Sequence, residues 1–143
     1  MRATSKNLWN FWKQPNTLVL VTTNNVCSSY GNLVMGAGVA LQAKYKIPEL
    51  PQLMSKYCGQ DYGLVVFPEY SIGCLQTKRH WKDKSPPDLV QFSLQTLALT
   101  AHVHSNWLFY LPKPGCGMGG LDWESEVAPI CWKILPDNCI VCL

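Results

Sequence analysis

The sequence predicts one α/β domain of 143 residues, in which helices cover both faces of a mixed, largely parallel sheet. Predicted strands alternate with predicted helices along the chain, as they do in three-layer α/β/α proteins. The apolar fraction of 48% and the charged fraction of 15% are typical of a compact globular protein. A buried strand that ends in a glycine-rich loop and a helix start indicates a ligand at the edge of this sheet.

The β-branched run 17–23 indicates a central strand, since both of its faces are apolar. It ends in Asn24 and Asn25, polar residues at the strand end where open α/β sheets bind ligands. Trp9, Phe11 and Trp12 indicate a short helix or turn. The other predicted elements are a helix to about residue 46, a short helix within 50–57, strands 64–67 and 72–76, a helix 85–103, a strand 107–111, a helix to about 134, and a strand 139–141.

Two glycine-rich loops each lead into a predicted helix, at 34–42 and at 112–120. Glycines allow a close approach of the backbone, so that several N–H groups can converge on one anion. Asp122 is the expected N-cap of the second helix. Its carboxylate and those of Glu124 and Glu126 would repel a phosphate at the helix end, so we expect the loop's own N–H groups to hold the anion. A turn without a ligand is the alternative.

The second loop differs from two familiar phosphate-binding motifs. A Walker A loop ends in Gly-Lys-Ser/Thr, whereas Leu121 and Asp122 follow Gly120 here. Segment 115–120 matches G-x-G-x-x-G, but only one more strand fits before Leu143, and no acidic residue closes that strand to hold a ribose.

Composition and cysteine usage indicate an intracellular, cytoplasmic protein without a membrane span. No run of about 18 apolar residues occurs, and the N-terminus lacks the apolar segment of a secretory signal. We therefore expect the seven cysteines to be free, mostly buried thiols. Neither they nor the histidines form a zinc pattern, so no metal site is predicted. The formal charge of +3 is compatible with an anionic ligand.

Three stretches together resemble a macro domain, the ADP-ribose-binding fold, and the resemblance covers the chain from about Leu18 onward. They are Val34-Met-Gly-Ala-Gly-Val-Ala-Leu-Gln42, Thr77-Lys-Arg-His-Trp81 and Pro114-Gly-Cys-Gly-Met-Gly-Gly-Leu-Asp-Trp123. The middle stretch, followed by a Lys-Ser pair, resembles the branch of DNA ADP-ribosyl glycohydrolase antitoxins. Terminal ADP-ribose protein glycohydrolases share its Thr-Lys.

The resemblance assigns roles to matching positions. It implies that Asn25 faces the distal ribose and that Lys78 lies near its anomeric carbon as the catalytic lysine. ADP-ribose is the implied ligand, with no cofactor. The residues implied to hold its diphosphate are Met35, Gly36, Ala37, Gly38 and Val39 in the first loop, and Gly115, Cys116, Gly117, Met118, Gly119 and Gly120 in the second.

A lysine suits this role, because an amine can attack a ribose carbon or assist departure of the leaving group. The alternative for Lys78 is a solvated or phosphate-pairing lysine. The residues that follow it are expected to contact nucleic acid, since an aromatic ring among cations can stack on a base; they are Arg79, His80, Trp81 and Lys82. The alternative is a solvated basic loop with Trp81 packed into the core.

Two positions depart from the family's pattern. Gly119 stands where protein-directed relatives carry an acidic residue, and Asn7 stands where the family has an adenine-contacting Asp. We therefore predict a monomeric ADP-ribosyl glycohydrolase that acts on a DNA nucleobase, with an ADP-ribosyltransferase as the implied partner. The alternatives are a non-catalytic ADP-ribose reader and a hydrolase acting on ADP-ribose 1″-phosphate or on modified protein.

Overall fold

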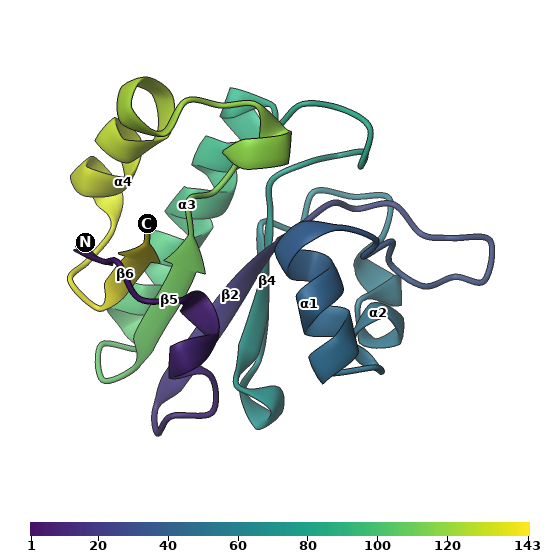
Figure 1. The fold of residues 1–143 in the computed structure, drawn as a ribbon, viewed down its shortest axis with the longest axis horizontal. Coiled ribbons are helices and arrows are strands. Elements are labelled where there is room, and N and C mark those ends of the chain that lie inside the picture. The colour runs from purple at the N-terminus through teal and green to yellow at the C-terminus, as the bar shows by residue number, and fades with distance from the viewer.

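A computed structural model describes all residues of the chain, 1–143, and forms a single six-stranded sheet of order β1-β6-β5-β2-β4-β3 (Figure 1). The strands are β1 (Arg2–Thr4), β2 (Thr17–Thr23), β3 (Leu64–Phe67), β4 (Ile72–Gln76), β5 (Leu108–Pro112) and β6 (Cys139–Cys142). The α-helices are α1 (Gly38–Lys46), α2 (Leu50–Leu53), α3 (Pro87–Val103) and α4 (Ala128–Ile134). Single-turn helices are η1 (Leu8–Phe11), η2 (Ser55–Tyr57), η3 (Pro68–Tyr70), η4 (Gly117–Gly119) and η5 (Trp123–Val127).

The sheet is mixed and largely parallel, as predicted. Strand β2 pairs in parallel with β4 and with β5, β6 pairs in parallel with β5 and with β1, and only β3 runs antiparallel to its neighbour β4. Thr23 is in register with Gln76 at the ends of β2 and β4. Because parallel strands end at the same edge of a sheet, the segments that follow β2, β4 and β5 emerge together.

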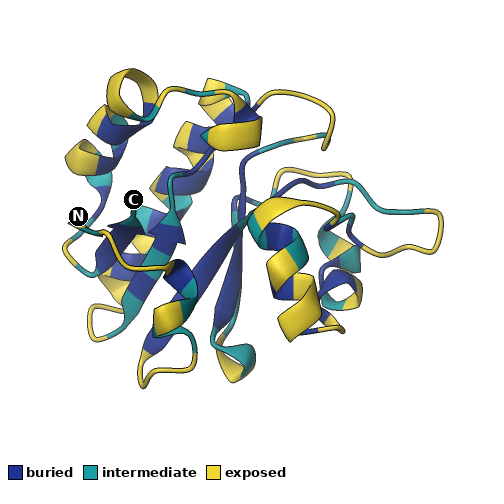
Figure 2. Ribbon diagram, in the orientation of Figure 1, coloured by how far each residue is buried: buried dark blue, intermediate teal, exposed yellow.

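Each face of the sheet carries its own apolar core. Leu18 and Leu20 of β2 pack in the core that α3 and α4 cover, whereas Val21 packs in the core that α1 and α2 cover. This alternation follows from the two-residue period of a strand. Figure 1 shows the two helix pairs on opposite sides of β2 and β4, and Figure 2 shows the strands between them as buried. The three-layer α/β/α architecture is therefore confirmed.

The predicted elements are present, including a strand with the predicted bounds 17–23. Helix α3 buries one apolar side against the core. Strand β1 was not predicted. It pairs with β6 at the sheet edge, and the buried amino group of Met1 donates to the carbonyl of Leu135 at 2.8 Å. Pro112 lies just beyond the predicted strand 107–111 but is the last residue of β5, paired with Cys142 of β6, whereas the pairing of β5 with β2 reaches only Tyr110.

The prediction that all seven cysteines are free is wrong for two of them, because a disulfide joins Cys27 and Cys58. The loop that follows β2 turns back against the segment that follows η2, which brings the two Cα atoms within 5.7 Å. The backbone N–H of Gly59 also donates to the carbonyl of Asn25 at 2.8 Å. The other five cysteines are free.

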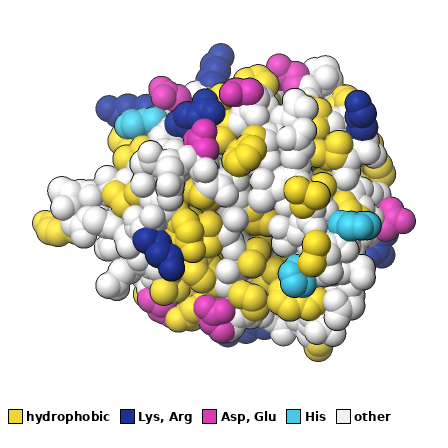
Figure 3. Space-filling view, turned by 180° about the vertical axis from the view of Figure 1, so that it is seen from behind, with side chains coloured by type: hydrophobic (Ala, Val, Ile, Leu, Met, Phe, Trp, Pro, Cys, Tyr) yellow, Lys and Arg dark blue, Asp and Glu magenta, His cyan; other side chains and the backbone are white.

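The outer face of α3 exposes Phe92, Leu99 and Val103 to solvent. Viewed from behind, the molecule shows apolar side chains over much of the middle of the face and charged side chains mostly toward its margin (Figure 3). No helix of the chain combines the length and the apolar character that a membrane crossing requires.

Candidate functional site

A cavity of about 570 Å³ lies at the edge of the sheet where β2, β4 and β5 end. Its wall consists of the end of β2, the first glycine-rich loop, the start of the loop after β4, and the second glycine-rich loop. The lining residues are Thr22, Thr23, Asn24, Val34, Met35, Gly36, Ala37, Gly38, Val39, Ala40, Thr77, Lys78, Trp81, Ser85, Pro112, Lys113, Gly115, Cys116, Met118 and Gly119. The fold thus brings both loops and Lys78 around one cavity.

The first loop presents the N-terminus of α1 to the cavity. All five of the predicted residues, Met35 to Val39, line the wall. The N-cap residue Ala37 has no side chain that could satisfy the first N–H groups of the helix, which lack partners within it. Gly38 adopts a left-handed φ of 58°, which glycine accepts without strain. Free N–H groups and the positive end of the helix dipole at this wall favour an anion.

The second loop closes on itself around the single turn η4. The N–H of Gly120 donates to the carbonyl of Gly117 at 3.0 Å, and the N–H of Leu121 donates to the carbonyl of Gly115 at 3.0 Å. Gly115 and Gly119 line the cavity together with Cys116 and Met118, whereas Gly117 and Gly120 lie outside its wall. Four of the six predicted residues of this loop therefore face the cavity.

Gly119 packs directly on Ser85. A Cβ atom at position 119 would lie 2.4 Å from the Ser85 Oγ, and the N–H of Ser85 donates to the Gly119 carbonyl at 2.8 Å. Ser85 is buried and its hydroxyl has no hydrogen-bond partner. The loop can approach the segment after β4 this closely only because residue 119 has no side chain.

The carboxylates that follow the second loop point away from the cavity. Asp122 caps the next helix as predicted, since its carboxylate accepts from the N–H of Ser125 at 2.9 Å. Hydrogen bonds from Ser125 lower the pKa of Asp122. Glu126 accepts from the N–H of Asp122 at 2.6 Å, and neither these residues nor Glu124 lines the cavity. This helix begins with the π turn η5 and continues as α4.

The only charged side chains on the cavity wall are the cations Lys78 and Lys113. Burial raises the pKa of the Cys116 thiol, so this group is neutral at physiological pH. A wall without a carboxylate and with two ammonium groups favours an anionic ligand. Lys113 was not predicted as a site residue, although its place between Pro112 and Pro114 at the end of a strand was a usable signal.

Lys78 is half-buried and lies two residues after the end of strand β4. Its backbone N–H donates to the carbonyl of Thr23 at 3.3 Å, and its Nζ donates to the carbonyl of Trp81 at 3.4 Å. The amine thus lies on the cavity wall and is held by one weak contact, which leaves it able to move toward a ligand.

The basic segment after Lys78 divides into two parts. Trp81 is 46% exposed and lines the cavity, so the alternative that packs it into the core is wrong. Its ring stacks on His80, with centroids 5.3 Å apart, and Lys82 Nζ lies 5.1 Å from the ring centroid. Arg79 instead turns to Asp61, with Nη2 and Oδ2 3.0 Å apart. The rings and Lys82 therefore form an exposed aromatic and cationic group beside the cavity.

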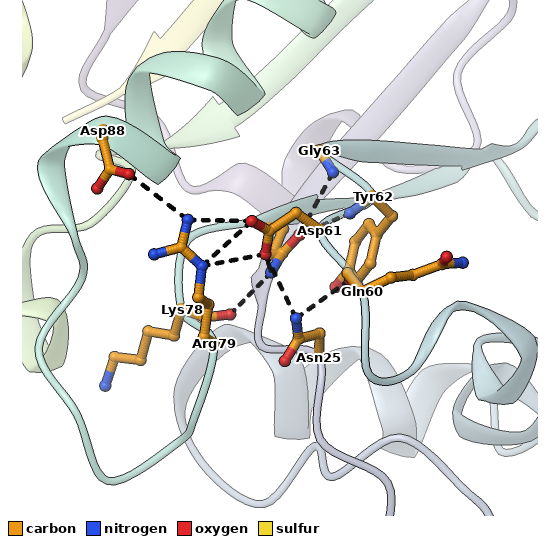
Figure 4. A network of polar contacts seen from close by, with 9 residues as sticks. Asn25, Gln60, Asp61, Tyr62, Gly63, Lys78, Arg79 and Asp88 are labelled. Atoms are coloured by element: carbon orange, nitrogen blue, oxygen red, sulfur yellow. Dashed lines mark hydrogen bonds and ion pairs between the residues drawn. The ribbon is translucent and has the colours of Figure 1, made fainter.

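Asn25 does not line the cavity, whereas the preceding Asn24 does. The Asn25 amide is largely buried and donates to the carbonyl of Gln60 at 3.1 Å and, at 3.5 Å, to Asp61 (Figure 4). In this arrangement the side chain supports the neighbouring loop. Its predicted place beside the distal ribose stays a prediction.

A second cavity of about 360 Å³ adjoins the first, and Val39 and Pro112 line both. Its wall includes Asn7, whose side chain also accepts from the N–H of Trp9 at 2.9 Å. The two cavities together provide an elongated site that leads from Lys78 past both loops to the N-terminal segment.

Sequence comparison finds relatives of one kind, although no protein-family model matches the chain. The DNA ADP-ribosyl glycohydrolase of Mycobacterium tuberculosis is 31% identical over 120 residues, which cover 76% of the chain and 32% of that protein. The DNA ADP-ribosyl glycohydrolase of Thermus aquaticus is 35% identical over 101 residues, which cover 63% of the chain and 28% of that protein. The chain thus spans about a third of the length of the curated relatives it matches.

Solved structures agree with the sequence comparison. The macrodomain of Thermus aquaticus DarG is 28% identical with a TM-score of 0.74, over 99% of the chain and 97% of that structure. The macrodomain of Mycobacterium tuberculosis DarG is 26% identical with a TM-score of 0.71, over 98% of the chain and 95% of that structure. Thermosipho africanus DarTG, solved in complex with ADP-ribose, shares the fold with a TM-score of 0.70 at 23% identity, over 90% of the chain and 38% of that structure.

The sheet order, the two glycine-rich loops at its edge and these similarities define the chain as a macro domain. Among macro domains it resembles the DNA ADP-ribosyl glycohydrolase branch, that of DarG, in sequence and in structure.

Proposed function

We propose that this macro domain binds ADP-ribose in the cavity at the edge of the sheet and hydrolyses the bond between ADP-ribose and a nucleobase of DNA. One observation carries the proposal: two glycine-rich loops and Lys78 line a single cavity whose only charged groups are cationic. Its volume of about 570 Å³ suits a nucleotide-sized ligand. The relatives named DNA ADP-ribosyl glycohydrolase support the choice of reaction.

In the proposed complex the diphosphate lies between the two loops, where N–H groups of the α1 N-terminus and of segment 115–119 stabilise its charge. Lys113 adds a cation on the same wall. The distal ribose then reaches Lys78 and Trp81. The adjoining cavity that contains Asn7 receives the adenine end of the ligand.

Lys78 acts at the anomeric carbon of the distal ribose. Either the amine assists a water that attacks this carbon, or the amine attacks it and forms a C–Nζ bond, which water then cleaves to release the lysine. The bond from the carbon to the base nitrogen breaks, its electron pair goes to the base, and the base takes up a proton. Water supplies the oxygen that remains on the ribose and the proton that the base receives, so the products are ADP-ribose and an unmodified base.

A DNA substrate is supported by the surface beside Lys78. Trp81 is exposed there with His80 stacked on it and Lys82 alongside, and such a group can stack on a base and pair with phosphate. The tight contact between Gly119 and Ser85 leaves no room for the acidic side chain of protein-directed relatives. An ADP-ribosyltransferase that modifies DNA is the proposed source of the substrate.

The proposal is tested with three substrates: an ADP-ribosylated DNA oligonucleotide, an ADP-ribosylated protein and ADP-ribose 1″-phosphate. We expect release of ADP-ribose from the DNA, loss of this turnover in Lys78→Ala, and retained ADP-ribose binding by calorimetry in that variant. Lys133→Ala, which changes a lysine on α4 outside the cavity wall, is the matched control. Binding without turnover of any substrate would make the domain a reader, and turnover of the phosphate ester alone would refute the DNA assignment.

A further inference from the structure

Behind Lys78, outside the cavity wall, lies a buried amide whose hydrogen bonds are all made. Gln76, the last residue of β4, is fully buried. Its Nε2 donates to Asp61 Oδ1 at 3.1 Å and to the carbonyl of Lys78 at 3.2 Å. Its Oε1 accepts from the N–H groups of Tyr62 at 2.8 Å and Gly63 at 3.4 Å. The side chain thus bridges the loop before β3 and the backbone of Lys78.

Asp61 determines which way this amide points. Its carboxylate can only accept hydrogen bonds, so it selects the Nε2 end of Gln76. A flipped amide would place Oε1 against Asp61 and the Lys78 carbonyl, and Nε2 against two N–H donors. Arg79 holds Asp61 through Nε and Nη2, both close to Oδ2 at 3.1 and 3.0 Å. Hydrogen bonds from Arg79 keep the pKa of Asp61 below its usual range, so the carboxylate is ionised at neutral pH.

The backbone of Lys78 is consequently held on both sides. The N–H groups of Thr77 and Lys78 donate to the carbonyl of Thr23 at 2.9 and 3.3 Å, and the Lys78 carbonyl accepts from Gln76. By contrast, the Lys78 amine has one contact at 3.4 Å. A fixed backbone beneath a free amine restricts the region that the amine can sample to the nearby part of the cavity.

We propose, building on the function proposed above, that Gln76 and Asp61 are positioning residues that aim Lys78 at the anomeric carbon. Neither lines the cavity, so neither contacts the ligand. Their loss therefore reduces the rate of the chemical step and leaves ADP-ribose affinity, which depends on the two glycine-rich loops, unchanged. A purely structural role would instead lower rate and affinity together.

The test compares Asp61→Asn with Asp88→Asn. Both change an aspartate that contacts Arg79, but Asp88 lies 3.5 Å from Arg79, is largely exposed and has no contact with Gln76. The asparagine amide replaces one of the two acceptor oxygens of Asp61 with an NH2 donor, although both oxygens accept hydrogen bonds from Gln76 and Arg79. We expect kcat on ADP-ribosylated DNA to fall about 10- to 100-fold in Asp61→Asn, and the Kd for ADP-ribose to change by less than about twofold. Asp88→Asn should match the wild type in both.

A second readout does not depend on turnover. Hydrogen exchange of the Lys78 amide, followed by mass spectrometry, should speed up in Asp61→Asn and in the volume-conserving Gln76→Met, and stay unchanged in Asp88→Asn. If the wild type hydrolyses nothing, the proposed function fails, whereas this exchange pattern still supports the hold of Gln76 and Asp61 on the Lys78 backbone. Unchanged exchange in Asp61→Asn, or equal losses of kcat and ADP-ribose affinity, would overturn the inference even with an active wild type.

Discussion

The contact between Gly119 and Ser85 predicts that Gly119→Ala destabilises the fold, because the added Cβ atom would clash with Ser85. The new Cβ would lie 2.4 Å from Ser85 Oγ, a full ångström inside the 3.4 Å at which ordinary contact begins. Ser85 cannot retreat easily, because it is buried and its N–H is bonded to the Gly119 carbonyl at 2.8 Å. Overpacking of this kind costs about 1 to 3 kcal/mol. Gly119 has no positive φ, so backbone strain adds nothing.

Removing the Ser85 hydroxyl separates the steric clash from other effects of the Gly119→Ala substitution. Ser85→Ala alone should change the free energy of unfolding by less than about 0.5 kcal/mol, since the hydroxyl has no hydrogen-bond partner to lose. In the Ser85→Ala background, Gly119→Ala faces only the Cβ of residue 85 at 3.2 Å, which small shifts relieve. The cost of Gly119→Ala should then drop below about 1 kcal/mol. The coupling energy between positions 85 and 119 is therefore expected to be about 1 to 2 kcal/mol.

Urea unfolding of the four proteins of this cycle, followed by tryptophan fluorescence, measures the coupling. Gly36→Ala is the control, because its Cβ would meet nothing within 4 Å and its φ is not left-handed. That variant should retain wild-type stability within about 0.5 kcal/mol or gain slightly from a less flexible unfolded chain. Equal costs of Gly119→Ala with and without the Ser85 hydroxyl would refute the steric argument.

Three further predictions concern the disulfide, the cavity and pH. Cys27→Ser opens a loop of 31 residues and should lower the free energy of unfolding in urea by about 3 to 4 kcal/mol on the chain-entropy estimate; wild-type stability in this variant would show that the bond does not form. Lys113→Ala should weaken ADP-ribose binding by calorimetry about tenfold, or about 1.4 kcal/mol, whereas equal affinity of this variant and Lys133→Ala would exclude a contact. Arg79 lowers the pKa of Asp61, so the stability that this pair contributes is complete above about pH 4, the pKa of an aspartate in the unfolded chain. This contribution is lost as pH falls through the lower pKa of the folded state, so the difference in unfolding free energy between wild type and Asp61→Asn should be constant from pH 8 to 5 and shrink toward pH 3. A difference that shrinks already near pH 6 would contradict this prediction.

Much of the fold could be predicted from short stretches of sequence. The strand 17–23 was predicted with its observed bounds, because an uninterrupted β-branched run suits a strand buried on both faces. The N-cap Asp122 follows from capping chemistry. Strand β1 was missed because three residues at a chain end carry no periodicity, and its partner β6 lies at the other end of the sequence.

The candidate site was only partly predictable, because some of its contacts join segments that are far apart in the sequence. Both glycine-rich loops and Lys78 have recognisable local patterns, and the structure brings them to one cavity. Lys113 has a weaker local signal and was missed. The contacts of Asp61 with Gln76 and Arg79 have no local signal at all, since they join the loop before β3 to the end of β4.

By itself the sequence determined every strand except β1, the main helices and the two glycine-rich loops, because backbone preference and hydrophobic period depend on neighbouring residues. Only the tertiary structure decided which glycines face the cavity, that Cys27 pairs with Cys58, and that a buried amide holds the backbone of Lys78. These features depend on distances between segments far apart in the chain, and such distances are set when the sheet pairs and the helices pack on it.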